Sequence, residues 1–322
     1  MRHQEQRSIH GTDVKVSRLG LGTAPLSGLF KNVAVSESDQ ILHHALSAGI
    51  SYIDTAPLYG YGVAEKRVAR GIKGFTPAPT ISTKVGRLLR PGKNSELDKW
   101  PDSDPNIEVY FDYSPSGIRR SLEESLERLG RDTIEIAYIH DADSRVREAI
   151  DVVYPALHAM REEGIIKAIG IGMNWCPPSI AIMRETDLNI ALIAGRYTLL
   201  DQSAQDELYP LALAKNVSII AAGVYNSGVL ANPVQGALYD YEIAPQEILD
   251  RARAIAKFLE KFNVTLPQAA LQFPLRHPAV ASVLTGPGSL AELEANIASF
   301  DAQLPDELWS EMEREGLIRP IS

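Results

Sequence analysis

The stretch SDQILHHALSAGISYI, residues 38–53, decides the fold because a helical repeat passes within it into a short apolar run. The helical part presents one apolar face, formed by Ile41, Leu42, Ala45 and Leu46. The run at 51–53 is one of eight short strand candidates, most of which are too apolar for half-exposed strands and are typical of strands buried on both faces. Helices that alternate with buried strands build parallel sheets.

The same alternation continues along the chain and gives eight strand–helix units. Eight units predict an α/β fold of the (β/α)8 TIM barrel type, with residues 1–322 as a single domain. A helix is predicted from Pro115 to Leu129, because proline begins it and Gly130 ends it. The strands are expected at Leu19 to Gly22, Ser51 to Ile53, Thr80 to Thr83, Ile134 to Ile139, Ala168 to Ile171, Ile190 to Ile193, Ser218 to Ala221 and Val280 to Leu284.

Three segments fall outside the repeat. Residues 8–16 predict an N-terminal β-hairpin, because two apolar runs flank a Gly- and Asp-containing turn. The insertions Arg87 to Ser114 and Val229 to Pro245 follow strands and are rich in Pro, Gly, Asn and Asp. Loops after strands lie on the C-terminal face of a barrel, where ligands bind, so we expect both to wall a pocket. A role as domain linkers is the less favoured alternative.

Composition narrows the classes of partner. The net charge of −9 and the pI near 5.4 provide no basic field for nucleic acid. No stretch reaches the roughly 20 apolar residues of a membrane span, and the N-terminus has no signal-like apolar region. Cys176 is the only cysteine, which excludes an intrachain disulfide and fits a reducing compartment. We therefore expect a cytoplasmic protein that binds neither nucleic acid nor membrane, as a monomer or homodimer.

Four ionisable residues occur at or just beyond the ends of three consecutive predicted strands. They are Asp54, Tyr59, Lys84 and His140. Each alone has an ordinary structural explanation, such as a turn cap, a loop contact or a solvated charge. Because the carboxyl ends of neighbouring barrel strands meet, these side chains are expected to converge at one mouth.

Together the four residues suit proton transfer. A phenol has a pKa of about 10, and a nearby ammonium lowers that value by favouring phenolate. Lys84 is expected to supply the ammonium and Asp54 to keep it charged. His140 is expected to donate a hydrogen bond to the substrate oxygen beside Tyr59.

These residues resemble the catalytic tetrad of the aldo-keto reductase superfamily. The resemblance extends over nearly the whole chain, through Gly20–Thr23, Asp54–Gly60, Gly170–Asn174, Asn226–Leu230 and Ala291–Asn296. It implies reversible hydride transfer between carbonyl and alcohol, with a nicotinamide nucleotide extended across the barrel mouth. It assigns cofactor contacts to Gly22, Thr23, Asp54, Met173, Asn174, Tyr225, Asn226, Ser227, Gly228, Leu230, Gly286, Ser289, Glu292 and Asn296.

The segment 286–292 bears on the cofactor. Relatives that prefer NADP place basic side chains there, whereas this chain has none and carries Glu292, whose carboxylate repels phosphate and accepts from a ribose hydroxyl. NAD is therefore expected over NADP. Two family residues near the nicotinamide are replaced by Ala194 and Ala222, and Tyr225 or Tyr197 is a candidate to compensate.

Within the superfamily the chain resembles the aldose 1-dehydrogenase branch, which includes L-fucose, D-threo-aldose and L-galactose dehydrogenases, with pyridoxal dehydrogenases nearby. Residues 111–114, 139–141, 194–202, 226–228 and 315–318 carry this likeness. It implies oxidation of a C1 hemiacetal, as in L-fucose, L-galactose or D-arabinose, to a lactone. The expected substrate pocket comprises Gly86, Arg87, Trp100, Tyr110 and Arg196.

Two alternative functions stay open, and a third is not expected. A reductase of small or aromatic aldehydes would use the same tetrad in reverse with NADPH. A regulatory nucleotide-binding subunit would keep the fold without useful turnover, although a complete tetrad disfavours it. A metal enzyme is not expected, because the adjacent His43 and His44 would face different directions on a helix and no His-x-His follows the first strand.

Overall fold

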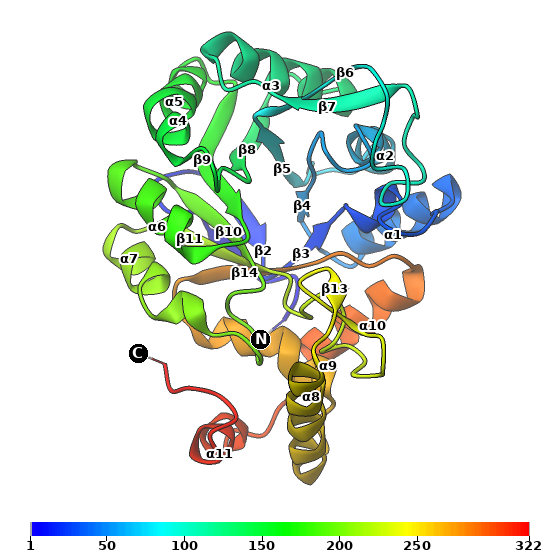
Figure 1. The fold of residues 1–322 in the computed structure, drawn as a ribbon, viewed down its shortest axis with the longest axis vertical. Coiled ribbons are helices and arrows are strands. Elements are labelled where there is room, and N and C mark those ends of the chain that lie inside the picture. Colours follow the sequence, from blue (N-terminus) through cyan, green and yellow to red (C-terminus); the bar gives the residue numbers. More distant parts are fainter. Residues whose placement is uncertain (1, 322) are drawn as a thin grey trace.

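The computed structural model describes residues 2–321 and contains a closed barrel of eight parallel strands, with helices around it (Figure 1). All eight predicted strands are present, and most extend one or two residues beyond their predicted ends. In barrel order the strands are β3 (Leu19–Gly22), β4 (Tyr52–Asp54), β5 (Thr80–Val85), β8 (Ile134–His140), β9 (Ile166–Met173), β10 (Ile190–Ala194), β11 (Ser218–Ala222) and β14 (Val280–Thr285).

The helices connect successive strands across the outside of the barrel. The helix predicted at 115–129 is present with Gly130 in a left-handed conformation at its end, as the sequence predicts. The full set is α1 (Val35–Ser47), α2 (Val63–Gly71), α3 (Pro115–Leu129), α4 (Val146–Glu148), α5 (Tyr154–Glu162), α6 (Cys176–Glu185), α7 (Leu208–Ala214), α8 (Gln246–Leu259), α9 (Leu266–Gln272), α10 (Leu290–Asp301) and α11 (Leu308–Arg314).

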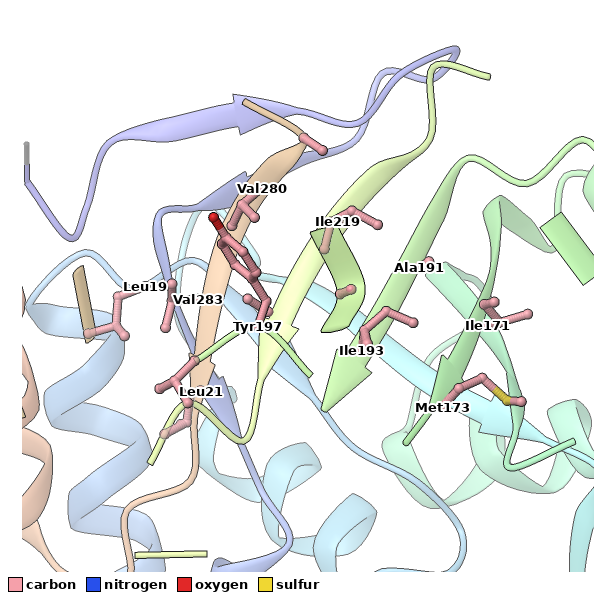
Figure 2. Packing of buried hydrophobic residues seen from close by; sticks show 14 of the residues in the cluster. Leu19, Leu21, Ile171, Met173, Ala191, Ile193, Tyr197, Ile219, Val280 and Val283 are labelled. Carbon is pink, nitrogen blue, oxygen red and sulfur yellow. The ribbon is translucent and has the colours of Figure 1, made fainter. Parts of the chain in front are cut away.

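The core has two layers because successive strand residues point to opposite faces. Leu19, Leu21, Ile171 and Met173 belong to the layer between strands and helices (Figure 2). The inner layer fills the barrel and contains Tyr52, Tyr138, Ile190, Leu192, Ile220 and Leu284.

The predicted N-terminal hairpin consists of β1 (Gln6–Ser8) and β2 (Lys15–Ser17), paired antiparallel. Its residues Ile9, Val14 and Val16 are buried and pack with the inner layer of the barrel. The hairpin therefore closes the end of the barrel opposite to the strand carboxyl ends, and leaves that other end for ligands.

Each long insertion contains a short hairpin that the periodicity did not predict. The first carries β6 (Arg87–Pro91) and β7 (Ile107–Phe111), and the second carries β12 (Leu238–Tyr239) and β13 (Glu242–Ile243). These strands pair with each other and not with the barrel, so the repeat gives no signal for them. Within residues 2–321, we found no helix with the length and apolarity needed to cross a bilayer.

We expect Gly20→Ala to destabilise the protein by about 1–3 kcal/mol, the usual cost of overpacking a core. A Cβ at this position would stand 2.6 Å from the Tyr52 ring and 2.9 Å from Leu284. Gly22→Ala is the matched control on the same strand, because its Cβ would approach no atom closer than 3.5 Å. Urea unfolding of both variants measures the difference, and equal stabilities would show that the inner layer tolerates the extra methyl group.

Candidate active site

The Lys84–Asp54 ion pair lies at the carboxyl ends of adjacent strands β5 and β4. The Lys84 Nζ donates to Asp54 Oδ2 over 2.7 Å and to the Thr55 carbonyl oxygen over 2.9 Å. Both side chains are only 2% exposed, so the charges are removed from water together. Ser82 donates to the other carboxylate oxygen of Asp54 over 2.7 Å. The pair is therefore fixed both by the strand register and by hydrogen bonds.

Tyr59 lies directly over this pair. The Lys84 Nζ is 4.5 Å from the centroid of the Tyr59 ring. The His140 ring stands nearly perpendicular to that ring at 6.0 Å, and Trp100 stacks on it at 6.0 Å. The structure thus brings together all four residues of the predicted tetrad, and places Trp100 against them.

The expected effect of Lys84 on the phenol is not what the structure shows. Burial raises the pKa of Tyr59 well above its usual value, and the carboxylates of Asp54 and Asp141 raise it further. Arg87 acts in the opposite direction. The expected lowering is not found because burial, the largest cause, disfavours the charged phenolate, and the Asp54 carboxylate that pairs with Lys84 adds to this effect. Tyr59 therefore rests as a neutral phenol.

His140 is uncharged in this environment. Burial lowers its pKa well below the usual value, and the cations Lys84, Arg87 and Lys99 lower it further. Its Nε2 lies 3.5 Å from Asp141 Oδ2, while Arg87 pairs with the same carboxylate oxygen over 2.9 Å. A neutral imidazole carries one N–H, so His140 is able to donate a single ring hydrogen bond to a substrate oxygen.

The tetrad opens into a cavity of about 320 Å³, and a second cavity of about 690 Å³ adjoins it. The two share lining residues, so they form one continuous trough from the tetrad to the first turns of α10. The shared residues are Pro25, Leu29, Gly223, Tyr241, Leu284, Thr285 and Gly286.

Most of the residues predicted to contact the cofactor line this trough. The part near the tetrad is lined by Gly22, Thr23, Asp54, Met173, Asn174 and Gly286. The outer part takes Tyr225, Ser227, Gly228, Glu292 and Asn296, with Gly286 at the junction. The trough runs from the tetrad to the start of α10, which fits a dinucleotide in an extended form.

Three predicted cofactor residues do not line the trough. Asn226 is buried and donates to the Gly195 carbonyl oxygen over 3.3 Å. Leu230 is part of the core, and Ser289 caps α10 by accepting from the Glu292 backbone N–H over 3.2 Å. The side chains of these residues hold the walls of the trough in place.

Of the residues predicted to form the substrate pocket, some lie at the cavity and others do not. Trp100 lines the cavity, and Arg87 reaches it through Asp141. Tyr110 instead contacts Arg90 of β6 and Arg120 of α3, and is not brought to the cavity.

Gly86 and Arg196 also serve other purposes than the one predicted. A Cβ on Gly86 would stand 2.4 Å from the Tyr113 ring, and the glycine has a φ of 101°, so its small size accommodates Tyr113 and the backbone turn. Arg196 is 7% exposed and bridges Asp201 and Asp240, which ties two loops together.

Sequence reasoning missed three ionisable residues of the cavity: Lys99, Asp141 and Tyr241. Asp141 directly follows His140, and Lys99 precedes Trp100, so adjacency to predicted residues was the available signal. Tyr241 lines both cavities. The suggestion that Tyr197 reaches the nicotinamide region was wrong, because Tyr197 packs against Tyr209 and Phe273 in the core.

Across the described residues 2–321, no group of three or more His, Cys, Asp or Glu side chains is arranged to hold a metal ion. Cys176 is a buried free cysteine, and burial raises the pKa of its thiol.

Comparison with known proteins agrees with the barrel and the tetrad. Residues 18–315 match the Aldo/keto reductase family, and the chain belongs to this family. It is 38% identical to a pyridoxal 4-dehydrogenase from Microbacterium luteolum, over an alignment of 341 positions that covers 99% of each chain. It is also 38% identical to a D-threo-aldose 1-dehydrogenase from a Pseudomonas species, covering 94% of this chain and 95% of the relative.

A solved structure has the same fold. A holo-form aldo-keto reductase from Bacillus halodurans superposes with a TM-score of 0.78 at 24% identity, covering 98% of this chain and 97% of that one. The family match and the two relatives at 38% identity show that the protein is an oxidoreductase of this family.

We expect the His140→Gln variant to lose less free energy of unfolding than the wild type as the pH falls. The unfolded histidine takes up a proton below about pH 6.5, whereas the folded one resists because its pKa is lowered, so this site costs stability as the pH falls. Between pH 7.5 and 5 the wild type should lose about 2 kcal/mol more than the variant. Urea unfolding at both pH values measures the difference. Parallel losses would contradict a neutral His140.

Proposed function

We propose that this protein oxidises the C1 hemiacetal of an aldose to the lactone by transferring hydride to NAD. The observation that carries the proposal is the convergence of Asp54, Tyr59, Lys84 and His140 on one cavity that continues into a long trough. The nicotinamide, when bound, accepts the hydride from carbon.

The residues of the chain manage the proton in this reaction. Oxidation breaks the C1–H bond and the O–H bond, and leaves a carbonyl oxygen. Tyr59 first loses its own proton to solvent, and the resulting phenolate takes the hydroxyl proton, so one proton is released per turnover. His140 orients the reacting oxygen by donating to it. Lys84 and Asp54 hold the ring of Tyr59 over a fixed charge pair. In the reverse direction the neutral Tyr59 donates its proton to a carbonyl oxygen.

The two relatives at 38% identity support a cyclic hemiacetal as substrate. In an aldose, a hydroxyl group of the carbon chain adds to the aldehyde and forms the ring, and pyridoxal closes in the same way because its aldehyde lies beside a hydroxymethyl group. Oxidation of either ring form gives a lactone. Pyridoxal is therefore the principal alternative substrate, and reduction of a simple aldehyde with NADPH is a second alternative.

The trough favours NAD. Among the described residues that line its outer cavity, none is Lys or Arg, while Glu292 is present. The Glu292 Oε2 accepts from the Gly288 backbone N–H over 2.7 Å, so the carboxylate is held at the start of α10. A 2′-phosphate would meet this negative charge, whereas a ribose hydroxyl would find an acceptor.

The proposal also covers the cellular compartment, the partners and the domain organisation of the protein. We place the enzyme in the cytoplasm, which its buried and unpaired Cys176 supports. Its partners are small molecules, with neither nucleic acid nor membrane among them, and it acts as a monomer or homodimer. All of its 322 residues are proposed to form one domain.

We expect Tyr59→Phe to lower kcat by about 100-fold or more, as for the loss of a general acid–base group. Reduced nicotinamide is followed by absorbance across L-fucose, L-galactose, D-arabinose, pyridoxal and a simple aldehyde, with each nucleotide. Because the pKa of Tyr59 is raised, the wild-type rate of oxidation should increase as the pH rises above 8. Nucleotide binding to the variant is the control, and an unimpaired variant would refute the role of the phenol.

We expect Glu292→Arg to shift the ratio of kcat/KM for NAD over NADP toward NADP by about tenfold or more, because a repulsive charge becomes attractive. Glu292→Gln is the matched control, since it keeps an acceptor for the Gly288 N–H and removes only the charge. Equal use of both nucleotides by wild type and an unchanged ratio in the arginine variant would contradict the preference for NAD.

A further inference from the structure

Lys99 lines the cavity that holds the tetrad, and hydrogen bonds hold its backbone in place. Its carbonyl oxygen accepts from the Phe30 backbone N–H over 2.8 Å, and its own N–H donates to the Glu96 carbonyl oxygen over 3.0 Å. Trp100 next to it is 2% exposed and stacks on Tyr59. The Lys99 backbone is therefore anchored beside the reacting group.

Side-chain contacts of two neighbouring acidic residues also fix the segment around Lys99. Asp102 pairs with the buried Arg67 of α2 over 3.0 Å and accepts from the Val33 backbone N–H over 3.2 Å. The carboxylate of Glu96 accepts from the Tyr61 hydroxyl over 3.1 Å. Both carboxylates are thus occupied by other groups.

The charges at the cavity do not cancel. Lys84 is paired with Asp54, and Arg87 with Asp141. Lys99 forms no ion pair with any residue in the described range 2–321, and its ammonium lies 5.9 Å from the Trp100 ring centroid. His140 is neutral. With Arg87 counted behind Asp141, three cations lie at the cavity with two carboxylates, in a protein whose net charge is −9, and the surplus cation is Lys99.

A cation at the wall of a partly closed cavity attracts an anionic group of the ligand more strongly than it would in open water. A neutral sugar offers only hydroxyl oxygens to it. An anionic oxygen on the ring, away from the reacting carbon, would complete the charge balance.

We propose that Lys99 is a specificity-determining residue, which selects hemiacetal substrates that carry an anionic oxygen. Two sources share this chemistry: the carboxylate of a uronic acid and the phenolate of pyridoxal. The inference rests on the proposed function and narrows its substrate class. Lys99 acts on binding and orientation, and takes no part in the transfer of proton or hydride.

The test compares kcat/KM for a matched pair of sugars, D-galacturonate and D-galactose, together with pyridoxal, in wild type, Lys99→Met and Lys99→Arg. The methionine variant keeps an unbranched side chain that is one atom shorter, and removes its charge. Lys93→Met is the matched control, because Lys93 is exposed on the same insertion and does not line the cavity.

We expect Lys99→Met to lower kcat/KM for the anionic substrates by about tenfold and for galactose by less than about twofold. Lys99→Arg should restore most of the loss, and Lys93→Met should change neither value. A loss confined to galacturonate identifies the carboxylate as the ligand, and one confined to pyridoxal identifies the phenolate. Equal effects on galactose and both anionic substrates would overturn the proposal.

Failure of the proposed function is distinguishable from failure of this inference. If the wild type oxidises none of these compounds, the proposed function fails, and calorimetric binding of galacturonate and galactose to the protein saturated with NADH then decides. Tighter binding of galacturonate that disappears in Lys99→Met supports the anion site. Equal binding of the two sugars to wild type overturns it.

Discussion

The Lys84–Asp54 ion pair is the constraint on which the site depends. Two buried charges are costly unless each has a partner and further hydrogen bonds, and here Ser82 and the Thr55 carbonyl oxygen supply them. These partners come from neighbouring strands whose register is set by the barrel ladder. A closed barrel is therefore the condition for a stable charge pair, and the pair in turn provides a rigid floor for Tyr59.

The phenol of Tyr59 depends on this floor in an unexpected way. An isolated ammonium would favour phenolate, but the ammonium in this site is already balanced by a carboxylate, and burial raises the pKa of the phenol. The resting site therefore holds its proton on oxygen and keeps His140 neutral. Both groups are ready to donate hydrogen bonds to a substrate oxygen, and among the described residues no carboxylate pairs with Lys99 at the wall of the cavity.

The sequence predicted the barrel strands well because each is a short, doubly buried apolar run, and burial on both faces leaves a clear pattern. It also predicted the meeting of the tetrad, since strand ends are neighbours in any parallel barrel. The β6–β7 and β12–β13 hairpins were not predicted, because they pair only with themselves. Gly86 and Tyr197 were misjudged because their contacts, Tyr113 and Tyr209, lie in distant parts of the chain.

The sequence by itself determined the alternation of buried strands and amphipathic helices, and with it the end of the barrel at which chemistry takes place. Those properties follow from local periodicity, which each segment carries independently. Only the tertiary structure decided which charges cancel and which do not. Arg87, Arg196 and Lys99 are alike as cations in sequence, but the first two meet carboxylates and the third meets none in the described chain, because ion pairing depends on distances in space.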